Sequence, residues 1–324
     1  MYKKSDLLFF EVKTPLHAGS GNDLGVIDLP IQRERHTEYP KIEGSSLKGA
    51  LREAFENIQI IEDPDPDRLS YHQSLHLLFG YDADAPAAKE VQTLLGDRTQ
   101  YSGSLAVSDA RILFFPIRSM KGVYAFATCP AVLKRFRSDI GLTGRELPEL
   151  NFNSQPTAYV TDTCSLHVSD NTVFLEEYAY DTVTIVDETM IGALEDYLSI
   201  FSIIDLNEKL IIIPDDDFRD FVVLSTEVIT RTKIDNLLGT VKKGALFNEE
   251  YLPENSILYS IVMASTIFHY PEIKQKFCGD DPDEANAVME FFRNKLPAYF
   301  QIGGNMTIGK GICQTSWLGG NNAD

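Results

Sequence analysis

The chain has 324 residues, of which 44% are hydrophobic and 24% are charged. These proportions are typical of a folded globular protein and exclude disordered and collagen-like chains. No apolar run reaches the roughly 18 to 20 residues of a membrane-spanning helix, and the apolar patch at residues 7–10 is too short for a signal-peptide core. We therefore expect a cytoplasmic protein with no membrane partner.

The net charge of -19 is unusual for a protein that binds nucleic acid. The acidic excess is uneven, however: residues 1–53 carry eight basic and eight acidic residues, and residues 103–145 carry seven basic against two acidic residues. Because salt screens exposed charges beyond about 10 Å, the local field matters more to a bound phosphate than the net charge does. The charge count therefore leaves RNA binding open.

Elements in the first half of the chain follow from hydrophobic patterning. A strand is predicted over residues 6–13, ahead of a Gly-rich segment at 17–21. Ser45 or Ser46 is placed to cap a helix. The apolar stripe of that helix has helical spacing and consists of Leu47, Leu51, Ala54, Phe55 and Ile58.

Further along, a second helix is predicted over residues 71–79, ending at Gly80, and a third over 129–138. Strands are predicted between these helices, over residues 103–107, 111–116 and 122–128. Polar residues are mixed with β-branched and aromatic ones through 146–184, a stretch poor in Gly, which suggests an inserted hairpin.

The last third of the chain mixes both kinds of element. Helices are predicted over residues 191–204 and 282–296, and strands over 210–213 and 221–224, followed by a β-rich stretch to residue 246. The acidic run at 215–217 is interpreted as an exposed loop. Strands and helices follow in no regular order, so the expected fold class is α+β.

The Gly-rich motif at residues 304–310 has the G-x-x-x-x-G-K spacing of a phosphate-binding P-loop. Gly311 follows it, where magnesium coordination requires Ser or Thr, so an ATPase is excluded. The remaining interpretations are a plain turn between a helix and a strand, or a turn that lets an RNA backbone approach, with backbone amides and Lys310 facing phosphate.

Other candidate residues are ambiguous when taken singly. Lys48 and Arg52 fit either a solvated helix or a helix start that binds phosphate. Asp28 fits a turn residue, and His17 fits a general base or a surface histidine. Glu249 and its neighbours fit a solvated acidic pair. The four cysteines are widely spaced and predict free thiols: Cys129, Cys164, Cys278 and Cys313.

The order of these motifs is more specific than any one of them. The chain carries T-P-L-H-A-G-S-G at 14–21, G-V-I-D-L-P-I-Q-R-E-R-H at 25–36, G-S-S-L-K-G-A-L-R at 44–52, E-E-Y-L-P at 249–253 and a final Gly-rich loop at 303–311. In this order the motifs resemble the RAMP superfamily of CRISPR proteins. The D-L-P-I-Q-R-E-R-H run narrows the resemblance to backbone subunits of the Cmr (type III-B) effector complex.

The resemblance implies one RAMP domain over residues 1–324, with insertions at about 60–100 and about 140–205. Its fold would be a ferredoxin-like palm, related to the RNA-recognition fold, with inserted finger and thumb elements. Copies of the chain would stack in a helical filament along a CRISPR guide RNA, beside other Cmr subunits. The thumb of each copy would unpair one nucleotide of the single-stranded target RNA at regular intervals.

The resemblance also implies an endoribonuclease and assigns its residues. Asp28 matches the residue required for metal-dependent target cleavage, which makes Mg²⁺ or Mn²⁺ the expected cofactor and Asp28 a possible metal ligand. His17 matches the histidine of the first motif, and Glu249 and Tyr251 match contributors from a neighbouring copy. An unstacked nucleotide can align its own 2′-hydroxyl with its phosphate, a group that DNA lacks.

Guide binding is assigned to two motifs and to a secondary group of cations. The first group is Ser45, Ser46, Lys48, Arg52, Gly303, Gly304, Asn305, Thr307, Gly309 and Lys310. The secondary group is Arg111, Arg118 and Lys121. Two alternatives remain: an architectural RNA-binding subunit without catalysis, and a solitary enzyme that processes CRISPR precursor RNA without metal.

Overall fold

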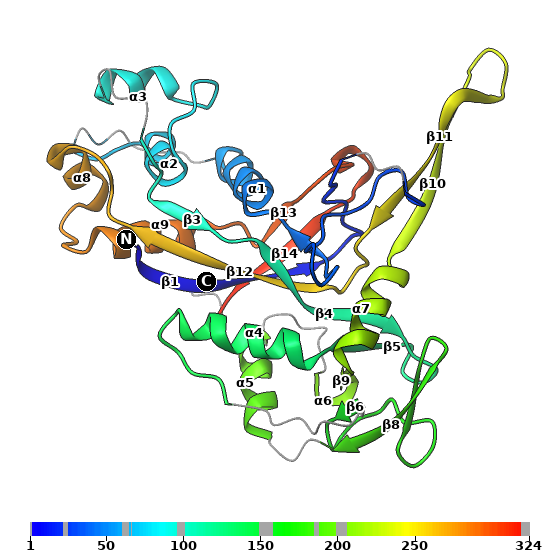
Figure 1. The fold of residues 1–324 in the computed structure, drawn as a ribbon. Coiled ribbons are helices and arrows are strands. Elements are labelled where there is room, and N and C mark those ends of the chain that lie inside the picture. Colours follow the sequence, from blue (N-terminus) through cyan, green and yellow to red (C-terminus); the bar gives the residue numbers. More distant parts are fainter. Residues whose placement is uncertain are drawn as a thin grey trace.

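A computed structural model describes residues 2–21, 25–59, 65, 67–95, 101–148, 158–184, 188–198 and 206–318. Across these residues, twelve strands join in one mixed sheet (Figure 1), whose main path is β13-β14-β1-β12-β4-β5-β9-β6-β8-β7. The strands are β1 (Tyr2–Val12), β2 (Lys41–Ile42), β3 (Leu105–Val107), β4 (Ala110–Arg118), β5 (Tyr124–Thr128), β6 (Ala158–Val160), β7 (Thr172–Leu175), β8 (Tyr178–Thr184), β9 (Leu210–Ile212), β12 (Ile257–Ser265), β13 (Tyr299–Gln301) and β14 (Ile312–Trp317).

Helices lie on both sides of this sheet (Figure 1). They are α1 (Gly44–Glu56), α2 (Tyr71–Phe79), α3 (Ala88–Leu95), α4 (Pro130–Gly141), α5 (Glu188–Leu198), α6 (Leu206–Lys209), α7 (Asp215–Leu224), α8 (Pro271–Cys278) and α9 (Glu284–Lys295), with a 3₁₀ turn at Met306–Ile308. The mixture confirms the expected α+β class. No helix in the described segments is long and apolar enough to cross a membrane.

Strand β1 is an interior strand of the sheet, and its second half is fully buried. It pairs antiparallel with β12 on one side and with β14 on the other. Residues 7–10 are buried on both faces of the strand, which explains the apolar run Leu-Leu-Phe-Phe there. Phe9 packs against Phe136 of α4 with 6.0 Å between ring centroids, and Leu8 lies opposite Trp317, against which Phe292 of α9 packs. This arrangement fixes where the segments that follow β1 and precede β14 emerge.

A separate two-stranded hairpin, β10 (Glu227–Ile234) and β11 (Val241–Tyr251), projects from the sheet (Figure 1). Its tip is exposed and apolar: Leu237 is 96% exposed and Leu238 is 76% exposed. Its base is buried, since Glu249, Glu250 and Tyr251 are each less than 5% exposed. The hairpin therefore has an anchored end and a free end.

Two helical segments differ from the sequence prediction. Residues 221–224 are not a strand but the end of α7, and Asp215 to Asp217 form its first turn rather than an exposed loop. The physical reason is visible in the sequence. Pro214 precedes the helix, the three carboxylates lie at the positive end of its dipole, and Phe218, Phe221 and Val222 are buried at helical spacing.

The start of α1 and the position of the Gly-rich turn also differ from expectation. Neither Ser45 nor Ser46 caps α1, because the helix begins at Gly44, with Glu43 as its N-cap residue. The Asp109 carboxylate, from the turn between β3 and β4, accepts the Gly44 amide at 2.8 Å instead. The Gly-rich turn joins two strands, β13 and β14, rather than a helix and a strand.

Candidate active site

The last residues of β11, at the base of the hairpin, point their side chains to alternate sides of the strand. Successive residues of a strand point to opposite sides, so Glu249 and Tyr251 share one side and Glu250 lies on the other. The Tyr251 hydroxyl donates to Glu249 Oε2 at 2.6 Å, a bond between two buried groups. This side of β11 meets the segment that follows β1.

His17 lies in that segment and completes the cluster. Its Nε2 is 3.5 Å from Glu249 Oε1, and its ring centroid is 5.6 Å from that of Tyr251. Its Nδ1 is 2.7 Å from the backbone oxygen of Glu250. A carbonyl oxygen can only accept, so Nδ1 carries a proton in this bond, and Nε2 is the ring nitrogen left to exchange a proton.

Three further side chains enter the cluster that the sequence analysis did not assign to catalysis. The Asn305 amide donates to Glu249 Oε1 at 2.6 Å and to the Tyr251 hydroxyl at 3.1 Å. Arg231 of β10 pairs with Glu249 Oε2 at 2.6 Å. Lys310 Nζ lies 5.1 Å from the centroid of the Tyr251 ring. Arg231 reaches Glu249 because the two occupy diagonal positions of the hairpin, a relation that follows only from the strand register.

The contacts shift the ionisation of two members. Burial alone would raise the pKa of Glu249, but hydrogen bonds from Tyr251 and Asn305 outweigh it and hold that pKa below its usual value. Burial, followed by the hydrogen bond to the Glu249 carboxylate, raises the pKa of Tyr251 to about 12. At neutral pH the cluster therefore holds a carboxylate and a protonated phenol.

The Gly-rich turn is held against the same histidine. The Gly304 amide donates to the backbone oxygen of His17 at 2.9 Å. Gly303 has a φ of +80°, and a Cβ there would lie 2.3 Å from that oxygen, so only glycine fits. Thr307 and Gly309 are exposed at the far side of the turn. Their assignment to RNA binding stays a prediction, whereas Gly303 serves a contact within the chain.

Asp28 lies beside β11 but outside the cluster. Its side chain is exposed, and its Oδ2 accepts the backbone amide of Asn248 at 2.8 Å. Leu29 forms a parallel bridge with Glu249. Asp28 therefore precedes a residue that pairs directly with a catalytic candidate. Among the described residues no hydrogen bond joins Asp28 to His17. Glu249 and Tyr251 contact His17 of their own chain, and their action from a neighbouring copy stays a prediction.

The two cations of α1 have partners within the chain. Lys48 Nζ donates to the Leu105 carbonyl at 2.8 Å, and burial, with the neighbouring Arg52, lowers the pKa of Lys48. Arg52 pairs with Glu56 at 2.7 Å and donates to the Gly80 carbonyl at 2.9 Å. The structure thus gives both side chains a packing role, and their role in RNA binding stays a prediction.

The secondary cations differ in exposure. Arg111 is held by Asp139 at 2.8 Å. Arg118, whose side chain is 73% exposed, reaches Glu176 at 3.1 Å, and the exposed Lys121 donates to the His167 carbonyl at 2.8 Å. Among the described residues, the partners of these three cations lie outside the His17 cluster. RNA binding by them stays a prediction.

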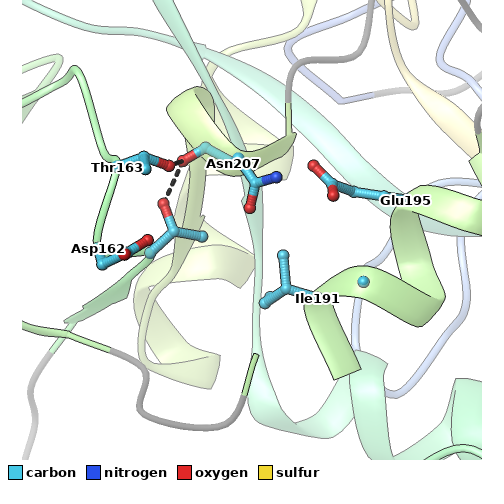
Figure 2. A pocket seen from close by; sticks show the side chains of 7 residues that line it. Asp162, Thr163, Ile191, Glu195 and Asn207 are labelled. Carbon is cyan, nitrogen blue, oxygen red and sulfur yellow. Dashed lines mark hydrogen bonds between the residues drawn. The ribbon is translucent and has the colours of Figure 1, made fainter. Parts of the chain in front are cut away.

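A polar recess lies elsewhere in the fold, where α5 and α6 approach the end of β6 (Figure 2). Figure 2 shows the Glu195 and Asn207 side chains pointing toward one another across it. Its lining residues are Thr161, Asp162, Thr163, Ile191, Gly192, Glu195 and Asn207. The Thr163 hydroxyl donates to the Asn207 carbonyl at 3.0 Å. The recess shares no element with the His17 cluster.

The family resemblance made Asp28 a possible metal ligand. Within the described parts of the chain, no group of three or more His, Cys, Asp or Glu side chains is arranged to hold an ion. Asp28 nevertheless suits Mg²⁺ as a single ligand, because it offers an exposed, hard carboxylate oxygen and Mg²⁺ keeps several waters and takes phosphate oxygens from its substrate.

Comparisons with known proteins agree with this fold. The model of the RAMP superfamily matches residues 9–314. The CRISPR system Cmr endoribonuclease Cmr4 of Pyrococcus furiosus is 36% identical over 323 residues, which covers 97% of this chain and 95% of that protein. The CRISPR system CMR subunit Cmr4 of Saccharolobus solfataricus is 26% identical over 336 residues, with 96% and 95% covered.

Solved structures give the same result. Oligomeric Cmr4 from Pyrococcus furiosus superposes with a TM-score of 0.66 at 31% identity, over 97% of this chain and 98% of that chain. A chain of the type III-B Cmr-beta complex bound to cognate target RNA gives 0.66 at 22% identity, with 98% of both chains covered, and supports the fold alone. The expected ferredoxin-like palm of the RAMP fold is confirmed.

Proposed function

The chain belongs to the RAMP superfamily, and from this premise we propose that it is a guide-RNA-binding backbone subunit of a type III-B CRISPR effector that cuts complementary target RNA. Its homology to a Cmr endoribonuclease covers nearly its whole length. The proposal places it in the cytoplasm, stacked with copies of itself and other Cmr subunits along the guide. Sequence choice would come from guide–target pairing, while the protein contacts RNA backbone.

One observation carries the catalytic part of the proposal. An exposed carboxylate, Asp28, lies along β11 next to the residues that hold His17 in a fixed tautomer. A nucleotide bound across this edge would meet a group that can orient its 2′-hydroxyl and a ring nitrogen that can accept a proton. Positioning and proton transfer are the two contributions that RNA transesterification needs from side chains.

Each residue of the site then has a defined task. Asp28 orients the 2′-hydroxyl toward the adjacent phosphate, and His17 Nε2 takes or returns the proton. The Glu250 carbonyl holds the His17 ring through Nδ1. Glu249 lies beside Nε2 and would stabilise the ring once Nε2 has taken the proton, and Tyr251 and Asn305 hold Glu249. A divalent ion bound at Asp28 would neutralise charge on the phosphate as the bond breaks.

The β10–β11 hairpin is the candidate thumb. Its exposed leucines, Leu237 and Leu238, are placed to enter between bases, and Lys233, Lys242 and Lys243 near the tip supply charge toward RNA backbone. Apolar side chains at the end of a stiff element can displace a base from its stack. The hairpin connects this tip to Glu249 and Tyr251 at its buried base.

The experiment that tests the proposal compares Asp28→Asn with the wild-type chain in the reconstituted, guide-bound complex. The asparagine oxygen can still accept the Asn248 amide, so the variant removes charge and keeps the local structure. We expect target RNA to bind with unchanged affinity and cleavage to fall at least about 100-fold.

Glu254→Gln is the matched control, since Glu254 is an exposed carboxylate in the turn that follows β11, and it should cut normally. Wild-type cutting by Asp28→Asn would leave the chain as an architectural RNA-binding subunit, with cleavage done elsewhere.

A further inference from the structure

Glu250 carries a buried carboxylate that the proposed reaction does not use. It is 2% exposed and points away from the His17 cluster. Its Oε1 accepts Arg33 Nη2 at 2.5 Å and the Thr226 hydroxyl at 2.8 Å, and its Oε2 accepts the Ile31 amide at 3.0 Å. Both oxygens are thus occupied by donors from two different segments.

These donors belong to the two parts of the chain that the proposed reaction must align. Ile31 lies in the same motif as Asp28, three residues after it. Thr226 immediately precedes β10 and so belongs to the root of the hairpin. Arg33 extends the link, because its Nη1 donates to the Val222 carbonyl at the end of α7.

The backbone of Glu250 contributes to the same junction. Its amide donates to the Leu29 carbonyl at 3.0 Å, and its own carbonyl accepts His17 Nδ1 at 2.7 Å. The Leu29 amide donates to the Asn248 carbonyl at 3.0 Å. One residue therefore touches the Asp28 segment, the hairpin root and the histidine. These two backbone bonds to the Asp28 segment both involve Leu29. The Glu250 carboxylate adds bonds to Ile31 and Arg33 further along the same segment.

Among the described residues, the Asp28 carboxylate accepts one hydrogen bond, from the Asn248 amide of β11. Asp28 is exposed, and its segment crosses β11 as a single bridge rather than as a ladder. Charge-assisted hydrogen bonds to a buried carboxylate are shorter and stronger than neutral ones. A misplacement of about 1 Å can cost about 100-fold in rate, so a shift of the Asp28 segment at this junction would lower the rate of cleavage.

We propose that Glu250 is a positioning residue whose carboxylate locks the Asp28 segment to the root of the β10–β11 hairpin. The junction sets the position of the Asp28 carboxylate relative to the hairpin root. This inference rests on the proposed function and adds to it a coupling between the hairpin and the aspartate.

Glu250→Gln tests the coupling in the guide-bound complex, and Glu34→Gln is the matched control. Glu34 is also buried, at 9% exposure, and its carboxylate pairs with Arg135 at 2.5 Å and accepts Thr37 at 2.6 Å. It lies in the same motif but binds α4 rather than β11. Both variants lose a buried ion pair, and only one of them loses the junction.

We expect Glu250→Gln to lower the single-turnover cleavage rate about 10- to 100-fold, with target affinity within about twofold of wild type. Hydrogen exchange should become faster in a peptide over residues 25–31 and stay unchanged in β1. Glu34→Gln should retain the wild-type cleavage rate. Thr226→Val, which removes only the link to the hairpin root, should give a smaller loss in the same direction and serves if Glu250→Gln does not assemble.

Two results would overturn the inference. One is wild-type cleavage by Glu250→Gln, or by Thr226→Val where Glu250→Gln does not assemble. The other is equal loss of cleavage and equal exchange in Glu250→Gln and Glu34→Gln, which would mean a general stability effect. Asp28→Asn in the same assay separates the two proposals. If it cuts, the proposed function fails, and if it is inactive while Glu250→Gln cuts normally, only the coupling fails.

Discussion

At the scale of single residues, the site depends on one carboxylate with several donors. Glu249 accepts Tyr251, Asn305 and Arg231 and lies beside His17. Sequence motifs identified Glu249, Tyr251 and His17 as candidates, because they occur in recognisable runs. Arg231 has no such motif, and its position beside Glu249 follows from the pairing of β10 with β11.

Tyr251→Phe tests the role of the hydroxyl. Because the phenol is buried and bonded to Glu249, its loss should destabilise the fold by about 1–3 kcal/mol at pH 7, measured by urea unfolding. Tyr39→Phe is the control, since the Tyr39 hydroxyl contacts only the Cys129 thiol, at 3.3 Å, among its described neighbours, and should cost less.

The cost of Tyr251→Phe should also depend on pH. The folded-state pKa of Glu249 lies below its usual value, so the stabilisation is full above the unfolded pKa of about 4.3 and is lost as pH falls through the folded pKa. Unfolding measured between pH 7 and about pH 3.5 should show the difference from wild type shrinking on the acid side. A constant difference across that range would contradict the assignment of the hydroxyl to Glu249.

At the scale of elements, local patterns predicted α1, α2, α4 and α9 and several strands, and missed α3, α7, α8 and β12. The bounds of α2 are those predicted, since a capping Ser70 and a final Gly80 mark its ends. In α7 the short run at 221–224 looked like a strand, while the helical spacing became evident only over the whole segment from Asp215. Strand β12, which is almost wholly buried, was not predicted at all.

The hairpin gives the prediction at this scale. Leu237→Asp together with Leu238→Asp should leave thermal stability within about 0.5 kcal/mol of wild type, because both side chains are exposed. Cleavage of target RNA should fall sharply, since the tip could no longer enter the base stack. Leu224→Asp, at a site 76% exposed outside the hairpin, should leave cleavage unchanged. Normal cleavage by the double variant would contradict the assignment of the hairpin as thumb.

At the scale of the whole molecule, the sheet order creates the site. Strand β1 pairs antiparallel with both β12 and β14, so the end of β1 lies beside the starts of the other two strands. The site forms at this end of the three strands, from His17 after β1, the residues of β11 before β12, and Asn305 before β14. Sequence patterns identify strands but not their neighbours, so this convergence could be anticipated only through the family resemblance. The internal partners of the two α1 cations, Lys48 and Arg52, come from segments distant in sequence, such as Leu105 and Gly80, so sequence patterns could not reveal them.

The most direct test of the account is the cleavage pattern of an end-labelled complementary RNA in the guide-bound complex. We predict a ladder of evenly spaced products that disappears with a chelator, returns with Mg²⁺, and is absent when every copy carries Asp28→Asn. Products without regular spacing, or a ladder that persists in the complex built wholly from Asp28→Asn chains, would contradict the claim that this chain cuts the target.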